Sequence, residues 1–348
     1  MLRIGIIYGG NSTEHDVSIL TGLHLAKHVT EAYQVTLIYL TRDNRIVLGS
    51  RKIDDYISGK AAKAKKFKQW QKLACVVNCC HGGVGEDGTL AAVLRFYNIP
   101  ITSCSSVSGW LQQSKIATRQ VLTVAGFLQP RFQILNSSED LSLVELPLPL
   151  VVKPDLQGSS IGISIARTKD ELRTAVDTAF SLGERVIVEE YIADMREVNV
   201  AVMREQNKII TSALEIVGGE KFFSFEEKYF NADSGFIKKG GQNPDDEFLN
   251  KIEKQIKFLA ERAYELFNAS GVVRVDFMVR GEEVILNEIN TVPGFMAYHL
   301  WLKARVPYGV VIDNLVQEAI ANHQKKQQFI TYYDSKILAK NRHLVVEF

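Results

Sequence analysis

The segment IGIIYGGNSTEHDVS, from Ile4 to Ser18, decides the fold class. Its apolar start, Ile4–Tyr8, predicts a short strand, and Gly9-Gly10 predicts a turn because glycine accepts a positive φ. Ser12 and Thr13, with Asp16 three residues after Thr13, predict a capped helix start. The order of strand, glycine turn and helix is typical of a parallel α/β layer.

The rest of the chain continues this alternation and then changes to antiparallel strands. Further strands are predicted at Tyr33–Leu40 and Ala74–Asn78, and alternation from Asn199 to Ile216 predicts antiparallel strands. An amphipathic helix at Glu247–Phe267 precedes two more strands. A length of 348 residues exceeds what one hydrophobic core usually serves. We predict an N-terminal domain (1–105), a central lobe (106–198), a C-terminal lobe (199–323) and an extension (324–348).

Composition excludes some classes of function. With 41 basic and 40 acidic residues, the chain has no general electrostatic reason to bind nucleic acid or an anionic membrane. No apolar run is long enough for a membrane span, and the N-terminus lacks the pattern of a signal peptide. The four cysteines could form disulfides, but we favour buried, reduced thiols in a cytoplasmic protein. The six lysines between residues 60 and 72 favour a solvated helix face over a phosphate-binding patch.

Two predicted strands near the C-terminal end carry the sharpest group of polar residues. Arg274 and Asp276 are two residues apart and share a face, as do Glu288 and Asn290 on the next strand. A hairpin would bring Asp276, Glu288 and Asn290 together as hard oxygen ligands of the kind that Mg²⁺ prefers. The alternative is a solvated sheet face. We favour a metal site, because carboxylates aimed at one spot repel each other unless a cation lies between them.

Several turns are candidates for nucleotide contact. The turn Gly158–Gly162 offers N–H groups and hydroxyls that could cradle phosphate, although such turns are also common connectors. Lys153, at the end of a buried strand, favours phosphate because a triphosphate would supply its charge partner. The stretch Glu189–Ile192 resembles a hinge whose backbone could bond adenine, and Glu197 could accept from ribose hydroxyls. The loop His81–Gly88 is equally compatible with close ligand approach and with a plain connection.

Together these segments resemble the D-alanine–D-alanine ligases of the ATP-grasp superfamily, from Ile4 to about residue 320. The matching segments are, in order, Gly9–Ser18, His81–Gly88, Val152–Pro154, Gly158–Gly162, Glu189, Arg196–Glu197, Lys228–Tyr229, Arg274–Asp276 and Asn287–Gly294. No single segment is decisive, but the ordered set is highly specific. The resemblance implies an α/β ATP-grasp fold with an N-terminal Rossmann-like (pre-ATP-grasp) parallel-sheet domain, and ATP between the last two lobes.

The resemblance also implies an activity and a role for each matching residue. ATP, with Mg²⁺ or Mn²⁺ as two ions, would drive the joining of two D-alanine molecules through an acyl phosphate, in a homodimer serving peptidoglycan synthesis. The implied ATP-binding residues are Lys115, Lys153, Ser159, Ser160, Glu189, Glu190, Ile192 and Glu197, and the metal ligands are Asp276, Glu288 and Asn290. The implied substrate-binding residues are Glu14, His81, Lys228 and His299, and the catalytic residues are Glu14, Ser159, Tyr229, Arg274 and Gly294.

Some positions depart from the family pattern. His299 stands where the family usually has the serine that binds the second substrate's carboxylate, and Ser114 stands where an aspartate usually precedes Lys115. Ser103-Cys104-Ser105 also replaces a usual glycine-containing turn. Three functions therefore remain open: a D-alanine–D-alanine ligase, a ligase with another second amino acid, and an ATP-binding regulator. Retention of Lys153 and Arg274 argues against the regulator. A NAD-dependent dehydrogenase is disfavoured, because no GxGxxG follows the first strand.

Overall fold

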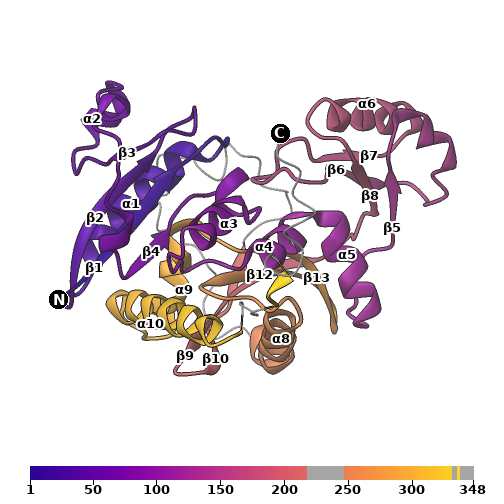
Figure 1. Ribbon diagram of the computed structural model, residues 1–348. Helices are drawn as coiled ribbons and strands as arrows, with labels where there is room; N and C mark the ends of the chain where they lie inside the picture. Colours follow the sequence, from indigo (N-terminus) through magenta and orange to yellow (C-terminus); the bar gives the residue numbers. More distant parts are fainter. Residues whose placement is uncertain (218–246, 331–334, 338–348) are drawn as a thin grey trace.

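Three β-sheets, each built from one stretch of the sequence, organise the computed structural model of the chain, which describes residues 1–217, 247–330 and 335–337. In Figure 1 the N-terminal sheet lies at the left and the central sheet with its covering helix at the upper right. The third sheet lies between them. The structure is thus the mixed α/β arrangement that the sequence predicts.

The N-terminal sheet has the strand order β3-β2-β1-β4. Its strands are β1 (Leu2–Gly9), β2 (Tyr33–Leu40), β3 (Ile46–Leu48) and β4 (Cys75–Asn78), and its helices are α1 (His15–His28), α2 (Asp54–Ile57) and α3 (Thr89–Phe96). Because β1 pairs in parallel with both β2 and β4, the predicted parallel layer is confirmed. Only the short β3 runs antiparallel to its neighbour.

The start of α1 differs from the prediction. The helix begins at His15, and its N-cap residue, Glu14, makes no side-chain capping hydrogen bond. The Ser12 hydroxyl instead donates to the carbonyl oxygen of His81 at 2.6 Å and accepts from the Glu14 N–H at 3.2 Å. The predicted cap is therefore wrong. Ser12 ties the first glycine turn to the loop after β4.

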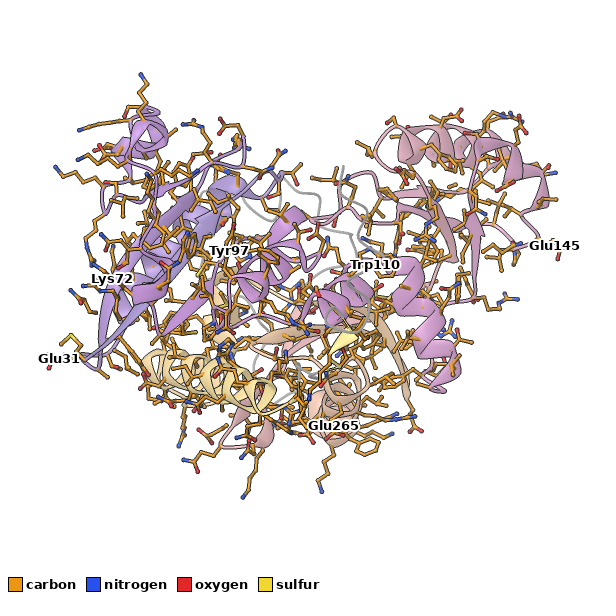
Figure 2. All side chains as sticks on the ribbon, in the orientation of Figure 1. Glu31, Lys72, Tyr97, Trp110, Glu145 and Glu265 are labelled. Carbon is orange, nitrogen blue, oxygen red and sulfur yellow. The ribbon has the colours of Figure 1, made fainter. Side chains whose placement is uncertain are left out.

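The lysine-rich stretch from residue 60 to 72 is solvated but is not a continuous helix. All six lysines are exposed, and Figure 2 shows Lys72 at the outer side of the N-terminal sheet. The backbone forms only two short 3-10 turns, Ala61–Lys63 and Trp70–Lys72. Phe67, between them, is buried. This anchoring of an extended segment under the sheet edge explains why the helix prediction is wrong.

The central lobe has a four-stranded sheet of order β5-β8-β6-β7 in which all neighbours are antiparallel. Its strands are β5 (Phe132–Leu135), β6 (Leu150–Pro154), β7 (Ser164–Ala166) and β8 (Val186–Glu190), and its helices are α4 (Ser106–Gln113), α5 (Lys115–Val124) and α6 (Lys169–Phe180). Helix α6 buries Leu172, Ala175, Val176 and Ala179, which share one face at helical spacing. The lobe therefore has a core of its own.

The third sheet has the order β10-β9-β12-β13, with β11 also paired to β9. Its strands are β9 (Arg196–Glu205), β10 (Lys208–Thr211), β11 (Glu215–Val217), β12 (Val273–Arg280) and β13 (Glu283–Asn290), and its helices are α8 (Glu247–Leu266), α9 (Tyr298–Lys303) and α10 (Tyr308–Gln327). All of the described pairings are antiparallel. The predicted antiparallel region and final hairpin are confirmed.

The N-terminal sheet and the third sheet share a hydrophobic core. Ile6 and Val77 belong to the same buried cluster as Ala201 of β9 and Val311 of α10. Since α10 continues to Gln327, the predicted limit at residue 323 falls inside a helix. The domain limits themselves remain predictions.

All four cysteines are buried and unpaired, as the sequence predicts. Burial raises the pKa of each thiol, which disfavours the reactive thiolate. In the described part of the chain, no helix has the length and apolarity needed to cross a bilayer.

Candidate active site

A direct contact joins the N-terminal domain to the central lobe. The Ser159 hydroxyl donates to Oε1 of Glu14 across 145 residues of sequence. A Cβ at Gly82 would lie 2.7 Å from Oε2 of Glu14, and one at Gly158 would lie 3.1 Å from the same atom. The Glu14 carboxylate therefore occupies a space that only glycine backbones leave open on two sides.

The turn that carries Ser159 is conformationally strained. Ser159 and Ser160 have φ of +51° and +59°, in the left-handed region that non-glycine residues rarely adopt. Gly162 follows with φ +73°, and a Cβ there would lie 2.5 Å from Leu182. Strained backbone of this kind persists where the surroundings hold it and is concentrated at functional sites.

A buried ion-pair cluster lies on one face of the antiparallel neighbours β6 and β8. The Glu189 carboxylate is 2.6 Å from Nζ of Lys153 and accepts a hydrogen bond of 2.6 Å from Nε of Arg119. All three side chains are almost fully buried. Burial alone would raise the pKa of Glu189, but the Arg119 and Lys153 cations lower it to about 2. Glu189 therefore stays charged and holds both cations in place.

A pocket opens beside this cluster. Its lining combines the polar Lys153 and Glu189 with apolar side chains, and the residues around it are Pro130, Val151, Lys153, Glu189, Glu190, Tyr191, Ile192, Met195, Met278 and Asn287. Ile192 and Met278 belong to one buried cluster, against which Met195 packs. Apolar walls with a few convergent polar groups are typical of small-molecule sites.

Lys115 lies at the first position of α5 and points to the strained turn. Its Nζ donates to the carbonyl oxygen of Gln157, and burial lowers its pKa, with nearby Lys153 adding to the effect. Ser114 caps α5 by accepting from the Ala117 N–H at 3.1 Å, and its hydroxyl donates to Asp155 at 2.8 Å. Ser114 thus supplies the helix start at the position where the family usually has aspartate.

The hairpin of β12 and β13 brings the predicted metal ligands together. Asp276 is opposite Glu288, and Arg274 is opposite Asn290. Arg274 donates to both carboxylate oxygens of Asp276 at 2.6 Å, and Nδ2 of Asn290 donates to Oδ2 of Asp276 at 2.9 Å. Burial alone would lower the pKa of Arg274, but Asp276 raises it. A fully buried carboxylate is thus compensated by a bidentate guanidinium.

Asp276, Glu288 and Asn290 are residues of the types that bind Mg²⁺. Among the described residues no three His, Cys, Asp or Glu side chains form a metal-binding group. Asp276 and Glu288 are instead a pair of carboxylates with the Asn290 amide beside them. Mg²⁺ is commonly held by one or two carboxylates together with substrate phosphates, so two carboxylates and an amide suffice. Their role as ligands remains a prediction.

Both ring nitrogens of His81 make hydrogen-bond contacts within the protein. Nε2 lies 2.7 Å from the hydroxyl of Thr21 on α1, and Nδ1 lies 2.7 Å from the carbonyl oxygen of Val292. The ring is buried, and burial lowers its pKa. His81 therefore contacts the turn that carries Gly294. Its predicted contact with a substrate carboxylate stays a prediction.

Glu86, from the same glycine-rich loop, is a titratable residue to which sequence reasoning assigned no role. Burial and the nearby Glu14 carboxylate raise its pKa to about 8. Glu14 and Glu86 are both half-buried. A carboxylate that raises the pKa of a second carboxyl group nearby indicates a place suited to a cation, of which a substrate ammonium is one kind.

The side chain of His299 contacts the carboxylate of Glu215. Its Nε2 lies 2.7 Å from Oε2 of Glu215 on β11, and Nζ of Lys303 lies 3.2 Å from the other carboxylate oxygen. Burial opposes ionisation of Glu215, but His299 and Lys303 lower its pKa. This small cluster of His299, Glu215 and Lys303 stands at the position of the serine in the family pattern.

The remaining predicted site residues are located as follows. Glu190 makes a more exposed ion pair with Arg131 at 2.7 Å, and Ile192 lines the pocket. Glu197 lies on β9 opposite Met278 of β12, and Gly294 follows β13. Lys228 and Tyr229 fall outside the described residues. Sequence reasoning missed Arg119, although its place four residues after Lys115 on one helix was an available signal.

The sheets and the hairpin define the class of the protein, an ATP-grasp fold behind an N-terminal parallel-sheet domain. The family model for the D-ala D-ala ligase N-terminus matches residues 3–104, and that for the C-terminus matches residues 121–321. The chain belongs to the D-alanine–D-alanine ligase family.

Individual relatives agree with this assignment. A D-alanine–D-alanine ligase of Thermosipho africanus is 30% identical, over 97% of this chain and 98% of its own length. The crystal structure of the Helicobacter pylori ligase superposes with a TM-score of 0.74 at 26% identity, covering 91% of this chain and 99% of that one. The ligase of Bacillus anthracis complexed with ATP is 23% identical with a TM-score of 0.71, covering 94% and 100%, and shows likeness of fold.

Proposed function

We propose that this protein is an ATP-dependent ligase that joins two D-alanine molecules into D-alanyl-D-alanine for peptidoglycan precursor synthesis. The observation that carries the proposal is the contact of Glu14 with Ser159, which closes the N-terminal domain over a site that also contains Lys153, Arg274 and Asp276. Family membership supports the same activity. A cytoplasmic homodimer is part of this proposal.

The reaction balances in two steps. A carboxylate oxygen of the first D-alanine attacks the γ-phosphorus of ATP, the bond to the bridging oxygen breaks, and an acyl phosphate and ADP form. The free amine of the second D-alanine then attacks the acyl carbon. The tetrahedral intermediate collapses by breaking the bond between the acyl carbon and the phosphate oxygen, and the proton lost from nitrogen leaves with inorganic phosphate. Both steps concentrate negative charge, which the cations Lys115, Lys153 and Arg274 would stabilise.

The first substrate would be held by the N-terminal domain. Its ammonium fits the Glu14 carboxylate, next to which the two glycines leave space. A bound ammonium would also lower the raised pKa of the nearby Glu86. The N–H of Gly294 and the guanidinium of Arg274 would stabilise the developing oxyanion. Mg²⁺ held by Asp276, Glu288 and Asn290 would add positive charge at the phosphates. Closure through Ser159, together with Tyr229, would protect the acyl phosphate from water.

The test is direct. Purified protein supplied with ATP, Mg²⁺ and D-alanine is expected to release ADP and phosphate and to form the dipeptide, as measured by coupled phosphate release and mass spectrometry. ATP binding without turnover would instead indicate the regulator, and the absence of dipeptide at saturating substrate would reject the proposal.

A second candidate is a ligase that takes another amino acid second, for instance D-serine. The observation that favours it is the His299–Glu215–Lys303 cluster, which differs in size and charge from a serine hydroxyl. A panel of D- and L-amino acids, each paired with D-alanine, decides between the two. D-alanine as best substrate at both positions would exclude the second candidate.

Replacing Gly82 with alanine is expected to raise the KM for D-alanine about tenfold, which corresponds to one charge-assisted hydrogen bond to the ammonium. The new Cβ would push against Oε2 of Glu14. Gly59→Ala is the matched control, because Gly59 also has a positive φ, +71°, but has no atom within 4 Å of its Cβ position. Gly82 has φ +65° and ψ 172°, a backbone conformation that is essentially limited to glycine, so its substitution also carries backbone strain. The predicted readout is therefore the KM for D-alanine, which Gly59→Ala should leave unchanged. Equal KM values would contradict the placement of Glu14.

A further inference from the structure

The hydroxyl of Thr21 lies where the N-terminal domain meets the turn after β13. Thr21 is fully buried on α1. Its Oγ1 is 2.7 Å from Nε2 of His81 and accepts a hydrogen bond of 3.3 Å from the N–H of Phe295. Nδ1 of His81 lies 2.7 Å from the carbonyl oxygen of Val292. A chain of hydrogen bonds therefore runs from Phe295 through Thr21 and His81 and back to Val292.

One assignment of protons satisfies the whole chain. The carbonyl oxygen of Val292 can only accept, so Nδ1 of His81 carries a proton. In a neutral ring Nε2 is then an acceptor, and the Thr21 hydroxyl donates a hydrogen bond to it. A lone pair of that hydroxyl accepts from the N–H of Phe295. Valine at position 21 would leave a ring nitrogen and a backbone N–H without these partners.

The turn that this chain holds is strained. Phe295, Met296 and Ala297 have φ of +50°, +51° and +53°, three successive left-handed residues without a glycine. Such a run persists only where its surroundings fix it. The Tyr308 hydroxyl donates to the carbonyl oxygen of Phe295 at 2.9 Å. The ring of Phe295 packs edge-on against that of His24, with the ring centroids 5.2 Å apart. Thr21 holds the N–H of the same residue.

We propose that Thr21 is a positioning residue for catalysis. Its hydroxyl couples His81 to both ends of the Val292–Phe295 turn and thereby fixes the direction of the Gly294 N–H, the expected oxyanion donor. This inference rests on the proposed ligase function. Because the donor is needed most when charge develops on the acyl oxygen, loss of the hydroxyl lowers kcat more than it raises KM.

Kinetics of three variants test the role. Thr21→Val is expected to lower kcat about 10- to 100-fold, since a shift of about 1 Å at a reacting group has effects of this size. Its KM values for ATP and D-alanine should stay within about threefold, and Thr21→Ser should restore kcat to within about threefold of wild type. Thr30→Val is the matched control, because Thr30 donates to Asp313 of α10 at 3.2 Å and so also links the N-terminal domain to the C-terminal lobe, away from the turn.

A second measurement does not depend on turnover. Hydrogen exchange of the peptide that contains residues 292–297 should be faster in Thr21→Val than in wild type and unchanged in Thr30→Val. Thr21→Ala provides another hydroxyl-free variant if the valine does not fold. Unchanged exchange, a raised KM with unchanged kcat, or a serine variant no better than valine would each overturn the proposal. A wild-type protein that forms no dipeptide would reject the ligase function alone, because the exchange experiment would still report on Thr21.

Discussion

Replacing Arg274 with methionine is expected to lower kcat for dipeptide formation about 100- to 1000-fold, the usual effect of removing one oxyanion-stabilising donor. Arg274 makes two hydrogen bonds of 2.6 Å to Asp276, a carboxylate with no exposed side-chain surface. The substitution removes the guanidinium that is expected beside the reacting atoms. It also leaves the negative charge of the buried Asp276 carboxylate without its bidentate partner. Steady-state kinetics at saturating ATP and D-alanine measure the effect.

Arg280 provides the control for Arg274. It lies on the same strand and pairs with Glu283 at 2.8 Å, but both side chains are about half exposed. Arg280→Met should leave kcat within about twofold, as expected for a surface pair. Arg274→Lys keeps the charge but cannot make the bidentate contact, so its kcat should be intermediate. A folded Arg274→Met variant with nearly wild-type kcat would show that the hairpin does not carry the chemistry.

Replacing Glu189 with glutamine is expected to lower the free energy of unfolding by about 3–5 kcal/mol, because it leaves Arg119 and Lys153 as buried cations without a counter-charge. Both cations lie 2.6 Å from the carboxylate. The matched control, Glu190→Gln, is the next residue of β8 and has a more exposed partner, Arg131. Its effect should stay below about 1 kcal/mol. Urea denaturation of both variants measures the difference, and equal losses would contradict the account of this cluster.

The Glu189 effect should also depend on pH in a defined direction. Its pKa is lowered to about 2 in the folded protein from an ordinary 4.5, so the charged form stabilises the fold. The advantage of wild type over Glu189→Gln is fully present above pH 4.5. It is lost as the pH falls through about 2, where the carboxylate is protonated in both states. An advantage that grows on acidification would have the wrong sign.

Local patterns in the sequence predicted the elements, and the hairpin of β12 and β13 is the clearest case. The two-residue repeat along Val273–Arg280 and Glu283–Asn290 predicts which side chains share a face of the sheet, Asp276 and Glu288 among them. The pattern does not reveal the register shift between Asp276 and Phe277, which the structure shows. The glycine turn after β1 likewise predicted a parallel layer. The helix prediction for the lysine-rich stretch was wrong, because charge spacing cannot reveal that Phe67 is buried and anchors an extended backbone there.

The pairing of charges was beyond sequence reasoning. The predicted contact of Glu189 with the nucleotide stays a prediction, but no sequence pattern indicates that its carboxylate pairs with Lys153 and Arg119, which come from two other elements. Both ring nitrogens of His81 are engaged by residues 60 and 211 positions away in the sequence. Such contacts depend on how the lobes are packed, and neither spacing nor residue type fixes that. The resemblance supplied the set of residues, and the geometry supplies their partners.

Transfer of oxygen from substrate to phosphate tests the central claim, that this site activates a D-amino acid carboxylate with ATP. D-alanine labelled with ¹⁸O in its carboxylate is incubated with ATP, Mg²⁺ and the protein, and the released phosphate is examined by mass spectrometry. We expect one ¹⁸O in phosphate for each dipeptide formed, because the attacking oxygen stays with phosphorus when the amine displaces it. Dipeptide formed with unlabelled phosphate would contradict an acyl phosphate, and with it this account of the site.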